Sequence, residues 1–184
     1  MPLDILALAA HRDDVEQTCA GTLLKMAERG YRTGILDLTQ GEMGTRGTAE
    51  DRAREAAEAA RILKVSWRQA LDIPDGRVEN TWENRLKVVR VLREQRPRVL
   101  ILPYWEGRHP DHYTASILGY EAAFLSGLAK LNSAVSHQQP RWRFGCASSS
   151  FQNYLRQPVP RRAAYVCRRH HRPVRIALCS GDGV

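Results

Sequence analysis

The sequence predicts an α/β protein in which helices cover both faces of a mainly parallel sheet, giving three layers. Short apolar runs at 5–10, 33–39 and 99–102 are separated by stretches whose apolar residues have helical spacing. Such runs are typical of strands buried on both faces, and strands that alternate with helices indicate βαβ units. The 184 residues, of which 43% are hydrophobic, are enough for one domain with a substantial core.

The first half of the chain follows this alternation closely. A helix is predicted over 15–29, because its apolar residues recur at helical spacing and Gly30 supplies a stop. The second strand leads into a glycine-rich loop at 41–48. Thr48 is a typical N-cap residue with an acidic residue three positions later, so the next helix is predicted over 48–63.

The second half is less regular at its start. Residues 64–80 indicate neither a strand nor a helix clearly, although their Pro-Asp-Gly sequence predicts a turn. A helix is predicted over 82–95, and Pro97 ends it before the third strand. The last predicted helix covers 113–130 and has a largely apolar surface.

The C-terminal part differs in composition, so we divide the chain into a core at 1–136 and a basic tail at 137–184. The tail holds nine arginines and one acidic residue, which account for the whole net charge of +8. It shows neither a clean helix nor a clean strand pattern, as expected of a divergent replacement segment or of translation in an altered frame. A basic arm can bind nucleic acid, but a solvated segment is the simpler interpretation and a nucleic-acid partner is not expected.

The cellular location is predicted from features that the sequence lacks. No apolar run approaches the ~20 residues that cross a bilayer, and the N-terminus does not resemble a secretory signal. We therefore expect a cytoplasmic protein with no membrane partner and with its four cysteines reduced.

Two polar segments each follow a predicted buried strand and precede a helix. The first is His11-Arg12-Asp13-Asp14 and the second is His109-Pro110-Asp111-His112. Ligands bind at the carboxyl edge of parallel sheets, so the two segments are expected to share one crevice. Two imidazoles and a carboxylate are typical ligands of a catalytic zinc ion, whose bound water becomes a nucleophile near neutral pH. The simpler alternative, that Asp13 or Asp14 only caps the following helix, leaves His112 unexplained.

These segments resemble the signatures of the LmbE-like family of zinc-dependent de-N-acetylases, also called the PIG-L family. The resemblance covers nearly all of residues 1–131, and the stretch 36–48 is especially similar to the bacillithiol-biosynthesis branch. It implies a Rossmann-like core, one Zn²⁺ per chain and hydrolysis of the N-acetyl group of a small-molecule N-acetylglucosaminide. The branch implies N-acetylglucosaminyl malate as the substrate, and related deacetylases are often homo-oligomers.

The resemblance also implies a role for each residue of the two segments. Three residues correspond to the zinc ligands of the family: His11, Asp14 and His112. Asp13 corresponds to the general base that takes a proton from the metal-bound water. His109, oriented by Asp111, would stabilise the tetrahedral oxyanion and protonate the leaving amine.

Substrate-binding residues are implied around the same edge. Arg52 occupies the place of a family arginine near the substrate, although Arg46 and Arg54 are close enough in sequence to compete for this role. Tyr104 follows the third strand and is expected at the rim of the pocket.

Arg12 departs from the family pattern, which usually has a proline between the histidine and the two aspartates. A proline would make the turn rigid, whereas an arginine brings a cation within reach of two carboxylates. That cation would lower the pKa of Asp13 and weaken it as a base. The alternative function is therefore a catalytically impaired or non-catalytic family member that binds a sugar or, through its basic tail, nucleic acid.

Overall fold

A computed structural model describes residues 1–131 with their side chains, and the backbone of the strands at 142–143, 164–169 and 172–179. The strands are β1 (Ile5–Ala9), β2 (Thr33–Asp37), β3 (Trp67–Ala70), β4 (Val99–Pro103), β5 (Trp142–Arg143), β6 (Ala164–Arg169) and β7 (Arg172–Cys179). The helices are α1 (Asp14–Thr18), α2 (Ala20–Glu28), α3 (Ala49–Ile62), α4 (Trp82–Gln95) and α5 (Pro110–Ser126).

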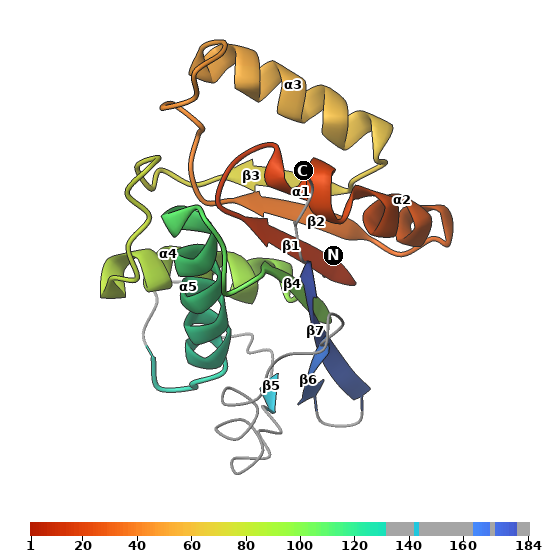
Figure 1. Cartoon of the computed structure of the whole chain (residues 1–184). Helices are drawn as coiled ribbons and strands as arrows, with labels where there is room; N and C mark the ends of the chain where they lie inside the picture. The colour runs from red at the N-terminus through yellow and green to blue at the C-terminus, as the bar shows by residue number, and fades with distance from the viewer. Residues whose placement is uncertain (132–141, 144–163, 170–171, 180–184) are drawn as a thin grey trace.

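All described strands belong to one sheet with the order β3-β2-β1-β4-β7-β6-β5 (Figure 1). The first four of these strands are parallel to one another. Strand β7 continues the sheet parallel to β4, and β6 and β5 follow as antiparallel neighbours. The sheet is therefore mainly parallel on the side that carries β1 and β4.

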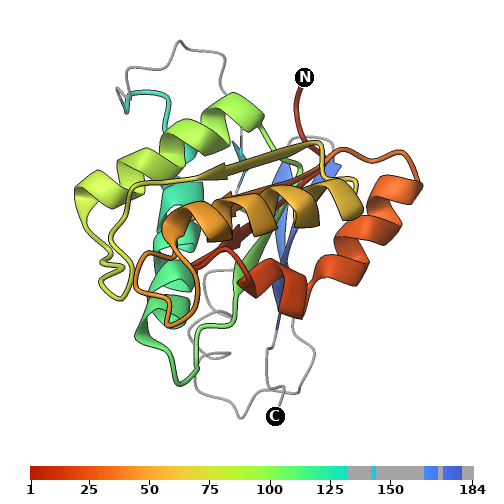
Figure 2. The same ribbon diagram turned by 90° about the horizontal axis from the view of Figure 1, so that it is seen from above.

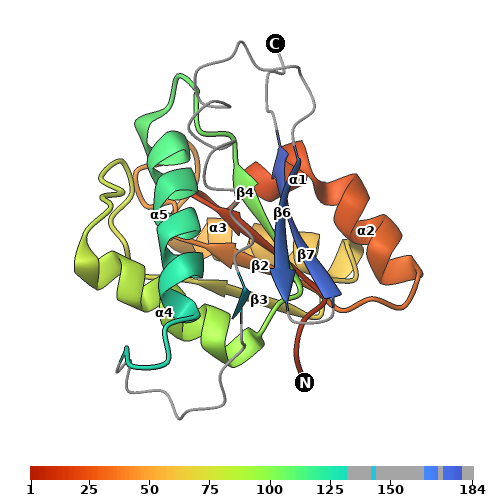
Figure 3. The same ribbon diagram turned by 90° about the horizontal axis from the view of Figure 1, so that it is seen from below.

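The sheet lies between two layers of helices, as Figures 2 and 3 show from opposite sides. Leu6 and Leu8 of β1 belong to a core cluster that also contains residues of α4 and α5. Ile5 and Ala7 belong to a second cluster with Val15 of α1 and residues of α2. The alternation along one strand thus assigns its side chains to opposite faces. This arrangement confirms the predicted three-layer α/β fold.

Helix boundaries depart from the sequence prediction in two helices, the one expected over 15–29 and α5, which ends at Ser126 instead of residue 130. The helix expected over 15–29 is two helices, because Cys19 leaves the helical conformation with φ −137°. Its apolar residues keep their helical spacing through the break, so periodicity does not reveal it. Helix α5 begins at Pro110 instead of residue 113, since the His109 side chain accepts a hydrogen bond from the Asp111 N–H and Pro110 fits the first helical turn.

The predicted start of α3 is confirmed in atomic detail. Thr48 Oγ1 accepts a hydrogen bond from the Asp51 N–H at 3.1 Å, and Asp51 Oδ2 accepts one from the Thr48 N–H at 2.9 Å. This reciprocal capping box satisfies two backbone donors that a helix start otherwise leaves free. The ambiguous stretch before α4 contains the short strand β3, which lies at the edge of the sheet.

Strands occur in the tail, where none was predicted, and this is a correction. Strand β7 pairs with β4 in the register Leu100↔Ile176, so part of the tail completes the sheet. Val174, Ile176 and Leu178 alternate as a strand requires, but the surrounding arginines conceal this pattern. Most of the tail lies outside the described residues. The altered-frame and nucleic-acid interpretations concern this part of the chain, so they stay predictions.

Candidate functional site

The strand order brings the two polar segments to one edge of the sheet. Strands β1 and β4 pair in parallel with Ala7 opposite Ile101, so their carboxyl ends are adjacent. His11 follows β1 after one residue, and the segment 109–112 follows β4 and opens α5. Gly119 allows α5 to approach β4 closely, since a Cβ there would lie 2.5 Å from a methyl group of Leu102. The shared crevice that the sequence predicts is therefore present.

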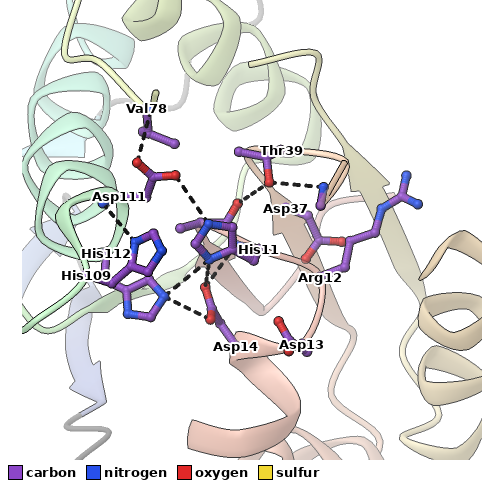
Figure 4. A network of polar contacts seen from close by, with 12 residues as sticks. His11, Arg12, Asp13, Asp14, Asp37, Thr39, Val78, His109, Asp111 and His112 are labelled. Atoms are coloured by element: carbon purple, nitrogen blue, oxygen red, sulfur yellow. Dashed lines mark hydrogen bonds and ion pairs between the residues drawn. The ribbon is translucent and has the colours of Figure 1, made fainter. Parts of the chain in front are cut away.

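Three side chains from the two segments converge on a single point (Figure 4). His11 Nδ1 lies 3.3 Å from His112 Nε2 and 3.6 Å from Asp14 Oδ2. The distance between His112 Nε2 and Asp14 Oδ1 is 3.1 Å. Ligand atoms at the corners of a tetrahedron around zinc, with bonds of about 2.0–2.1 Å, are about 3.3 Å apart. The spacing and the donor atoms of the three residues fit an ion of this size.

The other ring nitrogen of His11 faces two carboxylates. His11 Nε2 lies 3.0 Å from Asp75 Oδ1 and 3.2 Å from Asp111 Oδ2. Both aspartates are buried, with 8% and 2% of their side chains exposed. A histidine that donates its distal N–H to a carboxylate presents the other nitrogen as a metal ligand. The surroundings of His11 therefore favour the tautomer that leaves Nδ1 available.

Charges in this cluster shift the ionisation of its members when no metal is bound. Burial lowers the pKa of His11, but the hydrogen bond and charge of Asp14 and the charge of Asp75 outweigh it and raise the pKa to about 9. Burial raises the pKa of Asp14, yet its contacts with His11 and His112 bring it far below the usual value. A proton on His11 thus partly balances the carboxylates, and a metal ion would have to displace it.

Asp111 has different partners from those expected. Its carboxylate accepts hydrogen bonds from the N–H groups of Gly76 at 2.8 Å and Val78 at 3.2 Å, and it faces His11. Its contact with His109 runs through the main chain, where the Asp111 N–H donates to His109 Nδ1 at 3.2 Å. Asp111 thus contacts His109 through its backbone N–H, while its carboxylate faces His11. With Nδ1 as the acceptor, a neutral His109 carries its proton on Nε2.

Asp13 occupies the N-cap position of α1 without acting as a cap. Its side chain makes no capping hydrogen bond, and its carboxylate is exposed and accepts only a 3.3 Å hydrogen bond from Gln17 among the described residues. The Asp14 carboxylate instead closes the turn by accepting from the His11 N–H at 2.9 Å. The simple capping interpretation is thus wrong for Asp13.

Arg12 points away from the two neighbouring carboxylates, as Figure 4 shows. Its Nη1 donates to the Ala49 carbonyl at 3.1 Å, at the start of α3. Within the described part of the chain it forms no ion pair with Asp13 or Asp14. The expected contact between the Arg12 guanidinium and the Asp13 carboxylate is therefore absent from this conformation.

The predicted substrate-binding residues lie on different parts of the structure. Arg52 is half-buried beneath the glycine-rich loop, where a Cβ at Gly44 would collide with its guanidinium. Arg46 is exposed in that loop, and Arg54 is exposed and paired with Asp51. The rings of His11, His109 and His112 contact one another, and we call these three residues the histidine cluster. No described contact joins Arg52 or Arg46 directly to it.

Tyr104 lies beside a cavity that reaches the histidine cluster. Its ring packs against Trp105 with centroids 4.5 Å apart. The cavity has a volume of about 560 Å³ and is lined by Tyr104 together with Asp14, His109 and His112. It also borders Arg108, a cation that the sequence did not single out.

Asp75 is a site residue that the sequence analysis missed. Besides facing His11, its Oδ2 accepts a hydrogen bond from the Met43 N–H at 3.0 Å, and its own N–H donates to Glu42 Oε1 at 2.8 Å. Asp75 thereby links the glycine-rich loop, which covers Arg52, to the histidine cluster. The Pro-Asp-Gly sequence indicated a turn, but no local pattern indicates which distant segment that turn contacts.

Comparison with known proteins gives matches to deacetylases. Residues 6–123 match the family model described as GlcNAc-PI de-N-acetylase, PIG-L. The chain is 35% identical over 139 residues to a diacetylchitobiose deacetylase of Thermococcus kodakarensis, which covers 70% of this chain and 52% of that protein. The chain thus spans about half the length of this relative.

Solved structures with the same fold are also similar. The conserved protein TT1542 from Thermus thermophilus is 50% identical with a TM-score of 0.68, over 70% of this chain and 58% of that one. An N,N′-diacetylchitobiose deacetylase from Pyrococcus horikoshii, in complex with an inhibitor, is 26% identical with a TM-score of 0.64, over 68% of this chain and 51% of that one. In the described residues, no helix is both long and apolar enough to span a membrane.

Proposed function

Because the chain belongs to the GlcNAc-PI de-N-acetylase (PIG-L) family, we propose that it is a zinc-dependent N-deacetylase acting on a small molecule that contains N-acetylglucosamine. The observation that carries this proposal is the spacing of His11 Nδ1, Asp14 and His112 Nε2, which lie 3.1–3.6 Å apart. These three residues would hold one zinc ion per chain. When bound there, zinc supplies a Lewis acid for the amide carbonyl and a water of lowered pKa.

The neighbouring side chains divide the proton transfers between them. Asp13 is exposed next to the ligand Asp14, and its carboxylate takes the proton that the attacking water loses. His109 accepts from the Asp111 N–H at Nδ1, so its Nε2–H donates to the carbonyl oxygen as negative charge develops. The proton that Asp13 took from the water then goes to the leaving nitrogen, the C–N bond breaks, and acetate and a free amine are released.

The cavity beside the cluster suits a sugar-sized substrate. Tyr104, whose ring packs against Trp105, offers aromatic surface in its lining, and Arg108 supplies a positive charge. We propose N-acetylglucosaminyl malate as the substrate, since residues 36–48 are similar to the bacillithiol branch and an acidic aglycone would suit this cation. Arg52 and Arg46 would contact the sugar or the aglycone. We also propose that the protein is cytoplasmic and works as a homo-oligomer.

A second substrate candidate is N,N′-diacetylchitobiose. It is favoured by the 35% identity to the deacetylase of Thermococcus kodakarensis. This disaccharide is neutral, whereas the malyl glycoside carries two carboxylates. A preference for the malyl compound should therefore weaken as salt concentration rises, and a preference for the disaccharide should not.

Release of acetate from both compounds tests the proposal directly. The zinc-loaded protein should release acetate, and Asp13→Asn should lower kcat by about 10²–10⁴-fold as expected for loss of a general base. Asp72→Asn is the matched control, because Asp72 is an exposed aspartate paired with Lys87 away from the cluster. Activity that survives Asp13→Asn, or a zinc-loaded protein that cleaves neither compound, would contradict the proposal.

The non-catalytic alternative loses its main structural support. It depended on Arg12, whose guanidinium contacts Ala49 instead of the site carboxylates. Binding of nucleic acid through the tail is tested by its salt dependence, since phosphate contacts weaken steeply as salt rises.

A further inference from the structure

A buried arginine on β3 contacts the back of the turn that carries the proposed metal ligands. Arg68 has 9% of its side chain exposed, and all five of its N–H groups have acceptors. Its Nε and Nη2 donate to the two oxygens of Asp37 at 2.8 and 3.2 Å. Its Nη1 donates to Glu16 Oε1 at 2.5 Å and to the Ala56 carbonyl at 3.1 Å.

The fifth hydrogen bond reaches the main chain of the site. Arg68 Nη2 donates to the carbonyl of Arg12, which belongs to the peptide that joins Arg12 to Asp13. This peptide lies between the proposed ligands His11 and Asp14. Glu16 belongs to the same segment and lies in the first turn of α1, so Arg68 holds residues 11–16 at two points. We call residues 11–16 the site turn.

The contacts of Arg68 tie the site turn to the rest of the fold. Asp37 ends β2, Ala56 lies in α3, and Arg68 itself belongs to β3. In Figure 4, Asp37 and Arg12 lie on one side of His11, with His109 and His112 on the other. Because the guanidinium contacts Asp37 and the Arg12 carbonyl, it holds the site turn from the Asp37 side of His11.

We propose that Arg68 is a positioning residue for the metal site, holding the Arg12–Asp13 peptide and α1 so that His11 and Asp14 keep the spacing a metal ion requires. This inference rests on the proposed function, because it assumes that these residues bind zinc. A planar guanidinium can serve four separate acceptor groups at fixed angles, whereas a lysine ammonium has three donors on a flexible stem. Charge alone is not enough for this role.

The test compares Arg68→Lys with Arg93→Lys. Arg93 is a matched control because it is also buried and donates to three carbonyls, those of Ser126, Leu128 and Leu131, at the far end of α5 from His112. Both variants keep the positive charge and lose the planar guanidinium with its five N–H donors. The readouts are the zinc dissociation constant, and the rate of amide hydrogen exchange in residues 11–18 of the metal-free protein.

We expect Arg68→Lys to raise the zinc dissociation constant by about 10–100-fold, as loss of a group that orients metal ligands typically does. Exchange in residues 11–18 should accelerate in the same variant. Arg93→Lys should change neither quantity, even where both variants lower the free energy of unfolding to a similar extent. Zinc affinity and exchange rates equal to those of Arg93→Lys would overturn the inference and leave Arg68 a purely stabilising residue.

The experiment also distinguishes failure of this inference from failure of the proposed function, and it covers a variant that does not fold. Absence of zinc binding by the unaltered protein would refute the proposed function, while the exchange rates would still test whether Arg68 holds the site turn. If Arg68→Lys does not fold, Glu16→Gln removes one charged contact and leaves the Asp37 pair intact. This variant should accelerate exchange in residues 11–18, and unchanged exchange would overturn the inference.

Discussion

The two sides of the site turn contain buried and half-buried carboxylates in very different surroundings. On one side, Asp14, Asp75 and Asp111 contact histidines, and within the described residues none of them pairs with a lysine or an arginine. On the other side, Asp37 and Glu16 share the guanidinium of Arg68. The first side has an excess of negative charge, whereas the second carries its own cation.

This difference separates a binding site from a structural network. Buried carboxylates are costly unless a cation or hydrogen bonds compensate them. The fold provides a permanent cation where the chain must be held in place. Where it provides only histidines, which can give up their protons, an external cation can enter. The predictions below test this distinction, starting with the largest expected effect.

The identity of the metal ligands gives the largest expected effect. A second group of three residues, His11, His109 and Asp111, also has ligand atoms within 4.8 Å of one another. We expect His112→Ala to lose the bound zinc and His109→Ala to keep it while losing activity. Elemental analysis of the purified variants measures this. Zinc lost from His109→Ala and kept by His112→Ala would place the ion in the second group.

Removal of the carboxylate behind His11 should have an intermediate effect. Asp75→Asn replaces the charged acceptor that lies 3.0 Å from His11 Nε2. We expect the zinc dissociation constant to rise by about tenfold. This is the lower end of the range of about 10–100-fold that is typical when a hydrogen-bond partner of a metal-bound histidine is removed. Competition with a chromophoric chelator measures it, with Asp72→Asn as the control. Unchanged affinity would show that Asp111 alone orients His11.

The free energy of unfolding of the metal-free protein should depend on pH in two separate windows. One belongs to His11, on the histidine side of the site turn, and the other to Asp37, on the Arg68 side. The pKa of His11 is raised from 6.5 to about 9, and burial raises that of Asp37 from 3.8 to about 6 against the opposing effect of Arg68. Both groups hold their proton more tightly in the folded protein. The stability that each bound proton contributes is therefore complete below the pKa of the group in the unfolded protein. It is lost as pH rises through the pKa of the group in the folded protein.

Urea unfolding between pH 4 and pH 9 measures both windows. His11→Gln should remove the loss of stability between pH 6.5 and about 9, and Asp37→Asn the loss between pH 3.8 and about 6. A steep loss above pH 6.5 that persists in His11→Gln would assign that window to another group.

Replacement of Arg12 should have the smallest effect. Arg12→Pro removes the hydrogen bond to the Ala49 carbonyl, which is worth about 1 kcal/mol of unfolding free energy. Because the guanidinium points away from Asp13, we expect no gain in turnover. An increase in kcat would show that Arg12 reaches the site in solution and would restore the hypothesis that it impairs catalysis.

Much of the fold and of the site followed from local sequence patterns. Buried strands and amphipathic helices repeat with fixed periods, so their order was readable without a structure. The order of strands then placed both polar segments at one sheet edge, and the capping box at Thr48 was visible in four residues. Residues that touch because they are neighbours in sequence or in a regular topology are predictable in this way.

Contacts between distant segments were decided only by the tertiary structure. Asp75 faces His11, the Asp111 carboxylate accepts from Gly76, and Arg68 holds the Arg12 carbonyl. The same packing directs Arg12 toward α3, and pairing with β4 makes a strand of the arginine-rich stretch at 172–179. The side-chain contacts among these have no period or spacing in the sequence, and the alternation in 172–179 does not indicate which strand it pairs with. The sequence by itself determined which chemical groups reach the sheet edge, while packing determined their partners, because hydrogen-bond geometry depends on how separate elements dock.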